Sequence, residues 1–217
     1  METLNGNAFT DPFPHLIIDN FYNSDELELI WEELDFYTKP DKLLTAKDFG
    51  GVVGGTNAHA LSLDRVYKTN RKVSNILTVS RKIFESDILE SFAQIHGSCA
   101  LAPHINNDFT KVRYYHNGEY YNPHFDGQML YLAFTYFNRE PKKFSGGELY
   151  FPHYDYEFPC TNNSLIILPS WVAHGVREVK IEDSNYYDGW GRYAITHFLT
   201  IINENIVNEN KSKSDTV

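Results

Sequence analysis

The chain has 217 residues, a formal net charge of −10 at pH 7 and 42% hydrophobic residues. This length falls within the range of a single all-β sandwich or barrel domain, and the apolar content is ample for one core. The acidic balance argues against broad binding to nucleic acid or to anionic membranes, because both need clustered lysine and arginine. We therefore expect no nucleic-acid partner and no membrane association.

The cysteines and the amino-terminal residues indicate the cellular compartment in which the protein is expected. Cys99 and Cys160 are the two cysteines of the chain, too few for a disulfide scaffold. The opening METLNGNAFT lacks the basic start and apolar core of a signal peptide, and no apolar stretch approaches the roughly 20 residues of a membrane span. These features predict a soluble, cytoplasmic protein in a reducing compartment.

The first half of the chain predicts helices. After a short apolar strand in PHLIIDNF, Asn23 or Ser24 caps a helix that runs to about Phe36. Residues 39–70 are Gly-rich and irregular, and both a hairpin and a flexible active-site loop fit them. A second helical region spans about 73–95, with a break near Ser86 and Asp87. The first helix has an apolar stripe that we assign to the core, formed by Leu27, Ile30, Trp31 and Leu34.

From Phe109 onward the pattern shortens to strands punctuated by Gly, Pro and Asn. This pattern is typical of a jelly roll with helices packed on its outside. We therefore expect a mainly β fold with N-terminal helices (α+β), in one domain over residues 1–205. Its helical support spans about 1–100 and its jelly-roll core about 108–203. The polar tail 206–217 lacks apolar anchors and is predicted to be disordered.

A His-x-Asp pair lies within one of these predicted strands. In an extended strand, alternate side chains share one face, so we expect His124 and Asp126 to lie side by side. His174 lies far enough along the chain for several strands to run out and return beside them. Two imidazoles and one carboxylate form the facial triad of non-haem Fe(II) oxygenases, which leaves coordination positions open.

The sequence contains a second His-x-Asp pair, at His153 and Asp155. It lies close to His174 along the chain, with room for about two strands, and Pro152 and Pro159 flank it as in a loop. We therefore interpret His153 and Asp155 as a loop pair and predict that the metal ligands are His124, Asp126 and His174.

Several motifs in one order carry a family resemblance. The spacing Tyr-x-x-Gly-x-x-Tyr-x-x-His-x-Asp from Tyr115 to Asp126 is followed by TYFN, GGELYFP, His174 and then GRYAIT, which contains Arg192. Together, over about residues 110–201, they resemble the prolyl-hydroxylase branch of the 2-oxoglutarate/Fe(II)-dependent dioxygenases. The resemblance implies a double-stranded β-helix and Fe(II) held by His124, Asp126 and His174.

The resemblance also implies an activity and a cosubstrate pocket. Fe(II), 2-oxoglutarate and O2 would serve to hydroxylate an unactivated C–H bond with release of succinate and CO2, and ascorbate could stimulate turnover. Arginine suits the distal carboxylate of 2-oxoglutarate, since its planar fork pairs with a carboxylate through two hydrogen bonds. The matching residues are Arg192 and Tyr136, with Tyr115 and Thr196 as neighbours of that pocket. On the strand that follows His174, alternation predicts one face with Arg192, Ala194, Thr196 and Phe198 and the other with Tyr193, Ile195 and His197.

The substrate stays open at this point. The leading hypothesis is a peptidyl proline or similar protein side chain, and the alternatives are a free amino acid or other small metabolite, or a non-catalytic jelly-roll binding protein. The interval from His174 to Arg192 is longer than is usual in these hydroxylases, and we expect an extended hairpin within it. Phe198 also stands where related peptide hydroxylases often carry Trp. We predict that aromatic residues, the Gly-rich segment around Gly50 to Gly55 and the insertion over 183–190 line the substrate side.

Overall fold

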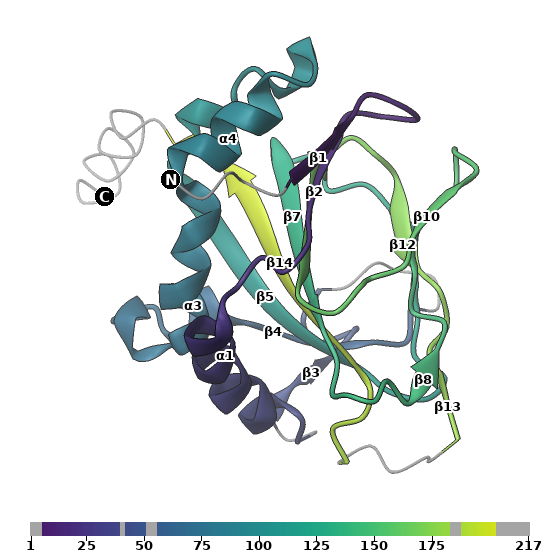
Figure 1. The fold of residues 1–217 in the computed structure, drawn as a ribbon. Helices are drawn as coiled ribbons and strands as arrows, with labels where there is room; N and C mark the ends of the chain where they lie inside the picture. Colours follow the sequence, from purple (N-terminus) through teal and green to yellow (C-terminus); the bar gives the residue numbers. More distant parts are fainter. Residues whose placement is uncertain (1–5, 40–41, 51–55, 183–187, 203–217) are drawn as a thin grey trace, which may run out of the picture.

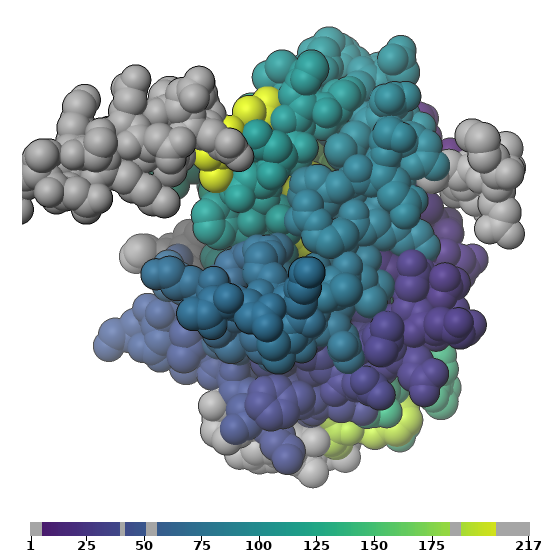
Figure 2. All heavy atoms as spheres, turned by 90° about the vertical axis from the view of Figure 1, so that its left-hand side faces the viewer, coloured from purple at the N-terminus to yellow at the C-terminus, as the bar shows by residue number. Residues whose placement is uncertain are grey.

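Two antiparallel β-sheets packed face to face form the centre of the computed structural model, which describes residues 6–39, 42–50, 56–182 and 188–202. Helices cover the outer face of the larger sheet (Figure 1). Figure 2, which looks onto that side, shows the purple-to-teal first half of the chain covering most of this face. The predicted mainly β fold with N-terminal helices is confirmed.

The larger sheet has eight strands among the described residues, all joined in antiparallel pairs. Its central strands are long and apolar because both of their faces are buried. In spatial order the strands are β1 (Gly6–Phe9), β2 (His15–Ile18), β11 (Ser164–Pro169), β7 (Tyr131–Phe137), β14 (Arg192–Thr200), β5 (Asn107–Tyr115), β4 (His59–Ser62) and β3 (Leu44–Thr45).

The smaller sheet faces the larger one and is built from short strands. In spatial order they are β10 (Tyr156–Phe158), β9 (Leu149–Phe151), β12 (His174–Val176) and β6 (Tyr121–His124). A separate pair of strands, β8 (Phe144–Ser145) and β13 (Lys180–Ile181), lies near one end of this sheet (Figure 1).

The helices are short apart from the first, α1 (Ser24–Tyr37). Asn23 caps it in a capping box: its side chain accepts a hydrogen bond from the Glu26 N–H at 3.0 Å, while the Glu26 carboxylate accepts one from the Asn23 N–H at 2.8 Å. The remaining helices are α2 (Leu63–Val66), α3 (Asn75–Val79) and α4 (Ser86–Ala93), with 3₁₀ turns at Arg71–Val73, Ser80–Phe84, Gly97–Cys99 and Ala102–His104. No helix of the described residues is long and apolar enough to cross a membrane.

Strand β14 separates two hydrophobic cores. Its outer face contributes Tyr193, Ile195 and Leu199 to a core shared with the helices. Its inner face contributes Ala194 and Phe198 to a second core between the two sheets. The sequence alternation predicted this division, and it places the inner face of β14 toward the smaller sheet.

Some regions of the chain refine the sequence-based expectations, and others lie outside the described residues. The segment 39–70 contains the hairpin, one of the two expected alternatives, as the antiparallel pair β3 and β4, and it continues into α2. The helical region 73–95 breaks at Glu85, the N-cap of α4, which is one residue before the expected break. The tail 206–217 and most of the insertion lie outside the described residues, so the disordered tail and the division of the single domain stay predictions.

Candidate metal centre and its neighbouring pocket

His124 and His174 lie directly opposite each other on paired strands. His124 is the last residue of β6 and His174 the first of β12, and the two form a register pair. Asp126 is different from the expectation, because β6 ends before it and its side chain reaches the site from the following loop. The smaller sheet therefore positions two of the three predicted ligands, and a loop positions the third.

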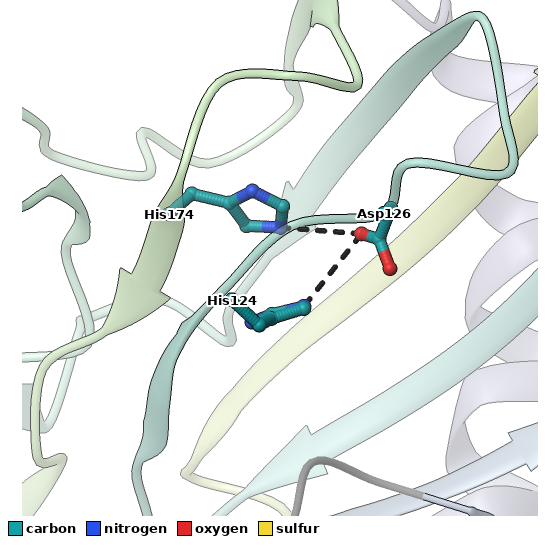
Figure 3. Close-up of side chains that lie close together, drawn as sticks. All are labelled: His124, Asp126 and His174. Carbon is teal, nitrogen blue, oxygen red and sulfur yellow. Dashed lines mark ion pairs between the residues drawn. The ribbon is translucent and has the colours of Figure 1, made fainter.

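The three side chains converge on one point (Figure 3). The Asp126 Oδ2 atom lies 3.6 Å from His124 Nε2 and 3.4 Å from His174 Nε2, and one ligand atom from each residue lies within 4.8 Å of the others. Among the residues that the structure describes, this is the one such cluster of His, Cys, Asp and Glu side chains. The arrangement has the two imidazoles and one carboxylate of an Fe(II) facial triad.

Backbone carbonyls orient both imidazole rings. His124 Nδ1 donates to the Asn122 carbonyl at 3.0 Å, and His174 Nδ1 donates to the Val172 carbonyl at 3.0 Å. Each Nε2 atom is thereby left as the acceptor that a metal requires. Burial lowers the pKa of His124, which favours the neutral form at neutral pH.

The charge of Asp126 completes the donor set. Burial alone would favour the neutral carboxyl, but the contacts of Asp126 with the neighbouring His124 and His174 hold its pKa well below the usual range. A carboxylate with two neutral imidazole nitrogens is a donor set that fits Fe(II). His153 and Asp155 lie in the turn between β9 and β10, and they are not part of the cluster.

Arg192 is buried beside the triad with unsatisfied hydrogen-bond donors. It is the first residue of β14 and is only 2% exposed. Its guanidinium lies between the rings of Tyr115, at 4.8 Å, and Tyr136, at 4.7 Å. Nη2 donates to Cys160 Sγ at 3.4 Å, whereas Nε and Nη1 have no partner among the described residues. A buried guanidinium without a carboxylate is costly, so this position fits an anionic ligand.

Further unpaired groups surround Arg192. The hydroxyls of Tyr136 and Thr196 are buried and have no hydrogen-bond partner in the described part of the chain. Burial raises the pKa of Tyr136 and of Tyr115, so both hydroxyls stay protonated and can donate at neutral pH. These donors fit the distal carboxylate of 2-oxoglutarate, as the sequence predicts. Arg192, Thr196 and Tyr115 line one cavity with the three predicted metal ligands.

The close approach of Arg192 on β14 explains why residue 147, the second of the adjacent Gly146 and Gly147, lacks a side chain. Gly147 has a φ of +78°, and a Cβ atom there would lie 2.7 Å from Arg192 Cδ. The missing side chain therefore leaves room for Arg192 to enter the space between the sheets.

Two further residues of the site escaped the sequence analysis. Arg113 lines the cavity with the triad, and Lys111 lines a larger groove that begins at Asp126. They occupy alternate positions before Tyr115 on β5, so strand alternation from Tyr115 could have revealed both.

The residues expected on the substrate side lie in several different places. Tyr115 and Tyr121 line the cavity, and Phe49, which precedes the Gly-rich segment, lines the groove. Gly51 to Gly55 lie outside the described residues. Trp190, at the end of the insertion, does not line the groove. The ammonium group of Lys143 lies over its ring, 3.5 Å from the ring centroid.

Comparisons with known proteins agree with this geometry. Residues 110–200 match the model of the 2OG-Fe(II) oxygenase superfamily. A PKHD-type hydroxylase from Prochlorococcus marinus (strain MIT 9215) is 31% identical over 140 residues, which cover 60% of this chain and 57% of that protein. The match thus spans a little over half the length of this relative. A second PKHD-type hydroxylase, from strain MIT 9312, is 28% identical over 172 residues, or 75% of this chain and 74% of that protein.

The fold has solved counterparts with low sequence identity. A prolyl hydroxylase from Trichoplax adhaerens, solved with a peptide fragment of the hypoxia inducible factor oxygen degradation domain, superposes with a TM-score of 0.58 at 17% identity. The similarity covers 91% of this chain and 84% of that one. Residues 110–200, which match the 2OG-Fe(II) oxygenase superfamily, contain all three residues of the triad and Arg192. The chain is thus similar in sequence to this superfamily and to PKHD-type hydroxylases, and it shares its fold with a prolyl hydroxylase.

Proposed function

We propose that this protein is an Fe(II)- and 2-oxoglutarate-dependent dioxygenase that hydroxylates an unactivated C–H bond of a peptidyl proline or a similar protein side chain. One observation carries the proposal: a convergent His124, Asp126 and His174 cluster shares a cavity with the buried, incompletely paired Arg192. A jelly-roll protein that only binds a ligand has no need for both parts together.

The residues of the chain divide the work between the two sheets. His124, Asp126 and His174 would hold the metal, and the carbonyls of Asn122 and Val172 fix the orientation of the imidazoles. Arg192 would bind the distal carboxylate of 2-oxoglutarate and so set its orientation. With both groups bound, they would supply the oxidising chemistry: one oxygen atom of O2 would enter the substrate C–H bond as hydroxyl, and the other would enter succinate as 2-oxoglutarate loses CO2.

Apolar side chains protect this site from water. Phe134, Leu149 and Val176 line the same cavity as the triad, and Phe134 lies edge-on to His174 with ring centroids 5.4 Å apart. Exclusion of water limits side reactions of reactive species and strengthens the charge interactions inside the site. The open side, beyond Asp126, leads into the groove where a substrate could enter.

Mass spectrometry tests the reaction and the substrate together. The protein is incubated with Fe(II), ascorbate, 2-oxoglutarate and either a library of proline-containing peptides or a mixture of free amino acids. We expect the peptides to raise succinate formation above the rate without substrate and to gain 16 Da. A 16 Da gain confined to free amino acids would replace the peptidyl substrate by a metabolite. No succinate under any condition would contradict the dioxygenase itself.

Tyr136→Phe tests the contribution of the Tyr136 hydroxyl to 2-oxoglutarate binding, which we expect to be smaller than that of Arg192. Loss of the hydroxyl removes one hydrogen bond to a charged group, which is worth about 1.5–3 kcal/mol. We expect the KM for 2-oxoglutarate to rise by roughly tenfold to a hundredfold, with the Fe(II) affinity unchanged. Titration of 2-oxoglutarate against succinate formation measures this, and an unaltered KM would remove Tyr136 from the pocket.

A further inference from the structure

Two cationic side chains on the inner face of β5 have no role in the proposed cosubstrate pocket. Lys111, Arg113 and Tyr115 alternate along this face, opposite Thr196, Ala194 and Arg192 of β14. Tyr115 and Arg192 form one end of the row. Arg113 continues the row within the cavity of the triad, and Lys111 continues it to the wall of the groove beyond Asp126.

Arg113 is buried between small neighbours and lacks an ion-pair partner. It is 8% exposed and faces Ala60 of β4 on one side and Ala194 of β14 on the other, so its long side chain has room. Its guanidinium lies over the rings of Phe49 and Tyr121, at 5.3 and 4.9 Å. Nη1 is buried without a hydrogen-bond partner, and no carboxylate in the described ranges pairs with this arginine.

Lys111 is half-buried at the wall of the groove. Its ammonium group lies over the rings of Phe198 and Phe49, at 5.0 and 5.9 Å. Burial and the charge of Arg113 lower the pKa of Lys111 to about 8. Two adjacent cations disfavour each other's charge, and an anion bound between them would relieve both.

Neither acid of the groove forms an ion pair with Lys111 or Arg113 in the described residues, although the charge of Asp126 partly offsets the fall in the pKa of Lys111. Asp64 pairs with Arg71 and accepts a hydrogen bond from the Thr110 N–H, and Asp126 belongs to the triad. The groove also contains Arg65 and Lys68, which have no ion pair within the part of the chain that the structure describes. A protein with a net charge of −10 thus presents a row of unpaired cations beside its metal site.

We infer that this groove binds an acidic peptide segment, in which a carboxylate next to the residue to be hydroxylated lies between Lys111 and Arg113. The inference rests on the proposed function and specifies its substrate. Charge complementarity identifies the occupant as acidic. The groove has a volume of about 990 Å³, at the upper end of small-molecule sites. Several cationic side chains are spread along the groove, Arg65, Lys68 and Lys111 among them. An extended peptide can contact several of them at once, whereas a single small acid cannot.

Matched peptide libraries test this inference. In one library Asp or Glu flanks each candidate target residue, and in the other Asn or Gln takes the same position. We expect at least a tenfold lower KM for the acidic library, and a smaller difference at high salt, because added ions screen exposed charges. Fluorescence anisotropy of labelled peptides, with Mn(II) and N-oxalylglycine in place of Fe(II) and 2-oxoglutarate, measures binding without turnover.

Variants of the two cations separate a substrate role from a cosubstrate role. Lys111→Gln and Arg113→Gln should each reduce the acidic preference severalfold through the KM for peptide, and Arg113→Lys should restore part of it. Lys72→Gln, at an exposed lysine of a 3₁₀ turn, is the charge control and should keep the full preference. Circular dichroism verifies that Arg113→Gln is folded.

The possible outcomes lead to different conclusions. Equal affinity for the acidic and amide libraries would overturn the acidic-peptide inference, while succinate and hydroxylated product would still support the dioxygenase. A rise confined to the KM for 2-oxoglutarate would place Arg113 in the cosubstrate pocket instead. Oxidation of free acidic amino acids alone would overturn the peptide as the occupant. If wild-type protein forms no succinate, the proposed function fails, and anisotropy still decides whether the groove prefers acidic peptides.

Discussion

Alanine substitution of His124, Asp126 or His174 is expected to reduce succinate formation to the background level. Each change removes one of three converging donors, whose ligand atoms lie within 4.8 Å of one another. Two remaining protein ligands do not provide the facial triad that holds Fe(II) and leaves positions open. Metal content after Fe(II) loading, measured by elemental analysis, should fall together with the activity.

His153→Ala is the matched control for the triad. This histidine also belongs to a His-x-Asp pair, but it lies in the turn between β9 and β10 and outside the cluster. We expect the variant to retain most of its succinate formation and its bound iron. If His153→Ala lost the metal while His174→Ala kept it, the assignment of the ligands would be wrong.

Arg192→Ala is expected to raise the KM for 2-oxoglutarate by about a hundredfold to a few thousandfold. Removing one partner of a buried charge pair typically costs about 3–5 kcal/mol, because the other charge stays buried without compensation. The present contact of Nη2 with Cys160 is a weak one to sulfur, so we expect Arg192 to exchange it for the carboxylate. Calorimetric titration of 2-oxoglutarate into the metal-loaded protein measures the loss directly.

A second arginine makes this experiment specific. Arg177 forms an exposed ion pair with Glu157, and such pairs contribute little. Arg177→Ala should therefore leave the 2-oxoglutarate affinity within about twofold, while Arg192→Ala keeps its iron and loses the cosubstrate. Equal affinity in wild type and Arg192→Ala would exclude Arg192 from the pocket.

Strand alternation correctly predicted which side chains share a face where the strand is long. The nine residues of β14 follow the expected pattern: Arg192, Ala194, Thr196 and Phe198 all line the cavity. For His124 and Asp126 the same rule gives the wrong reason for their proximity. β6 ends at His124, so Asp126 does not belong to the strand. The two side chains nevertheless meet, since the loop after β6 returns Asp126 to the imidazoles.

Other parts of the structure could not be inferred from one sequence. The strands β3 and β4 are two and four residues long, too short for a periodic pattern, and pairing with β5 rather than local preference defines β4. Arg113 was missed because an arginine in a sequence is normally assigned to the surface. Its burial depends on Ala60 and Ala194, which only the sheet register places beside it.

The contact between α1 and β14 connects the amino-terminal helix to the strand that carries Arg192. Trp31 of α1 packs edge-on against Tyr193, with ring centroids 5.3 Å apart, and the Thr38 hydroxyl that follows the helix bonds the Tyr193 hydroxyl. Tyr193 is the neighbour of Arg192 on the opposite face of the strand, and displacements of about 1 Å can cost a hundredfold in rate. A substitution in this helix that shifts Tyr193 would therefore also move the backbone that positions Arg192, although the helix lies on the opposite side of the larger sheet from the triad.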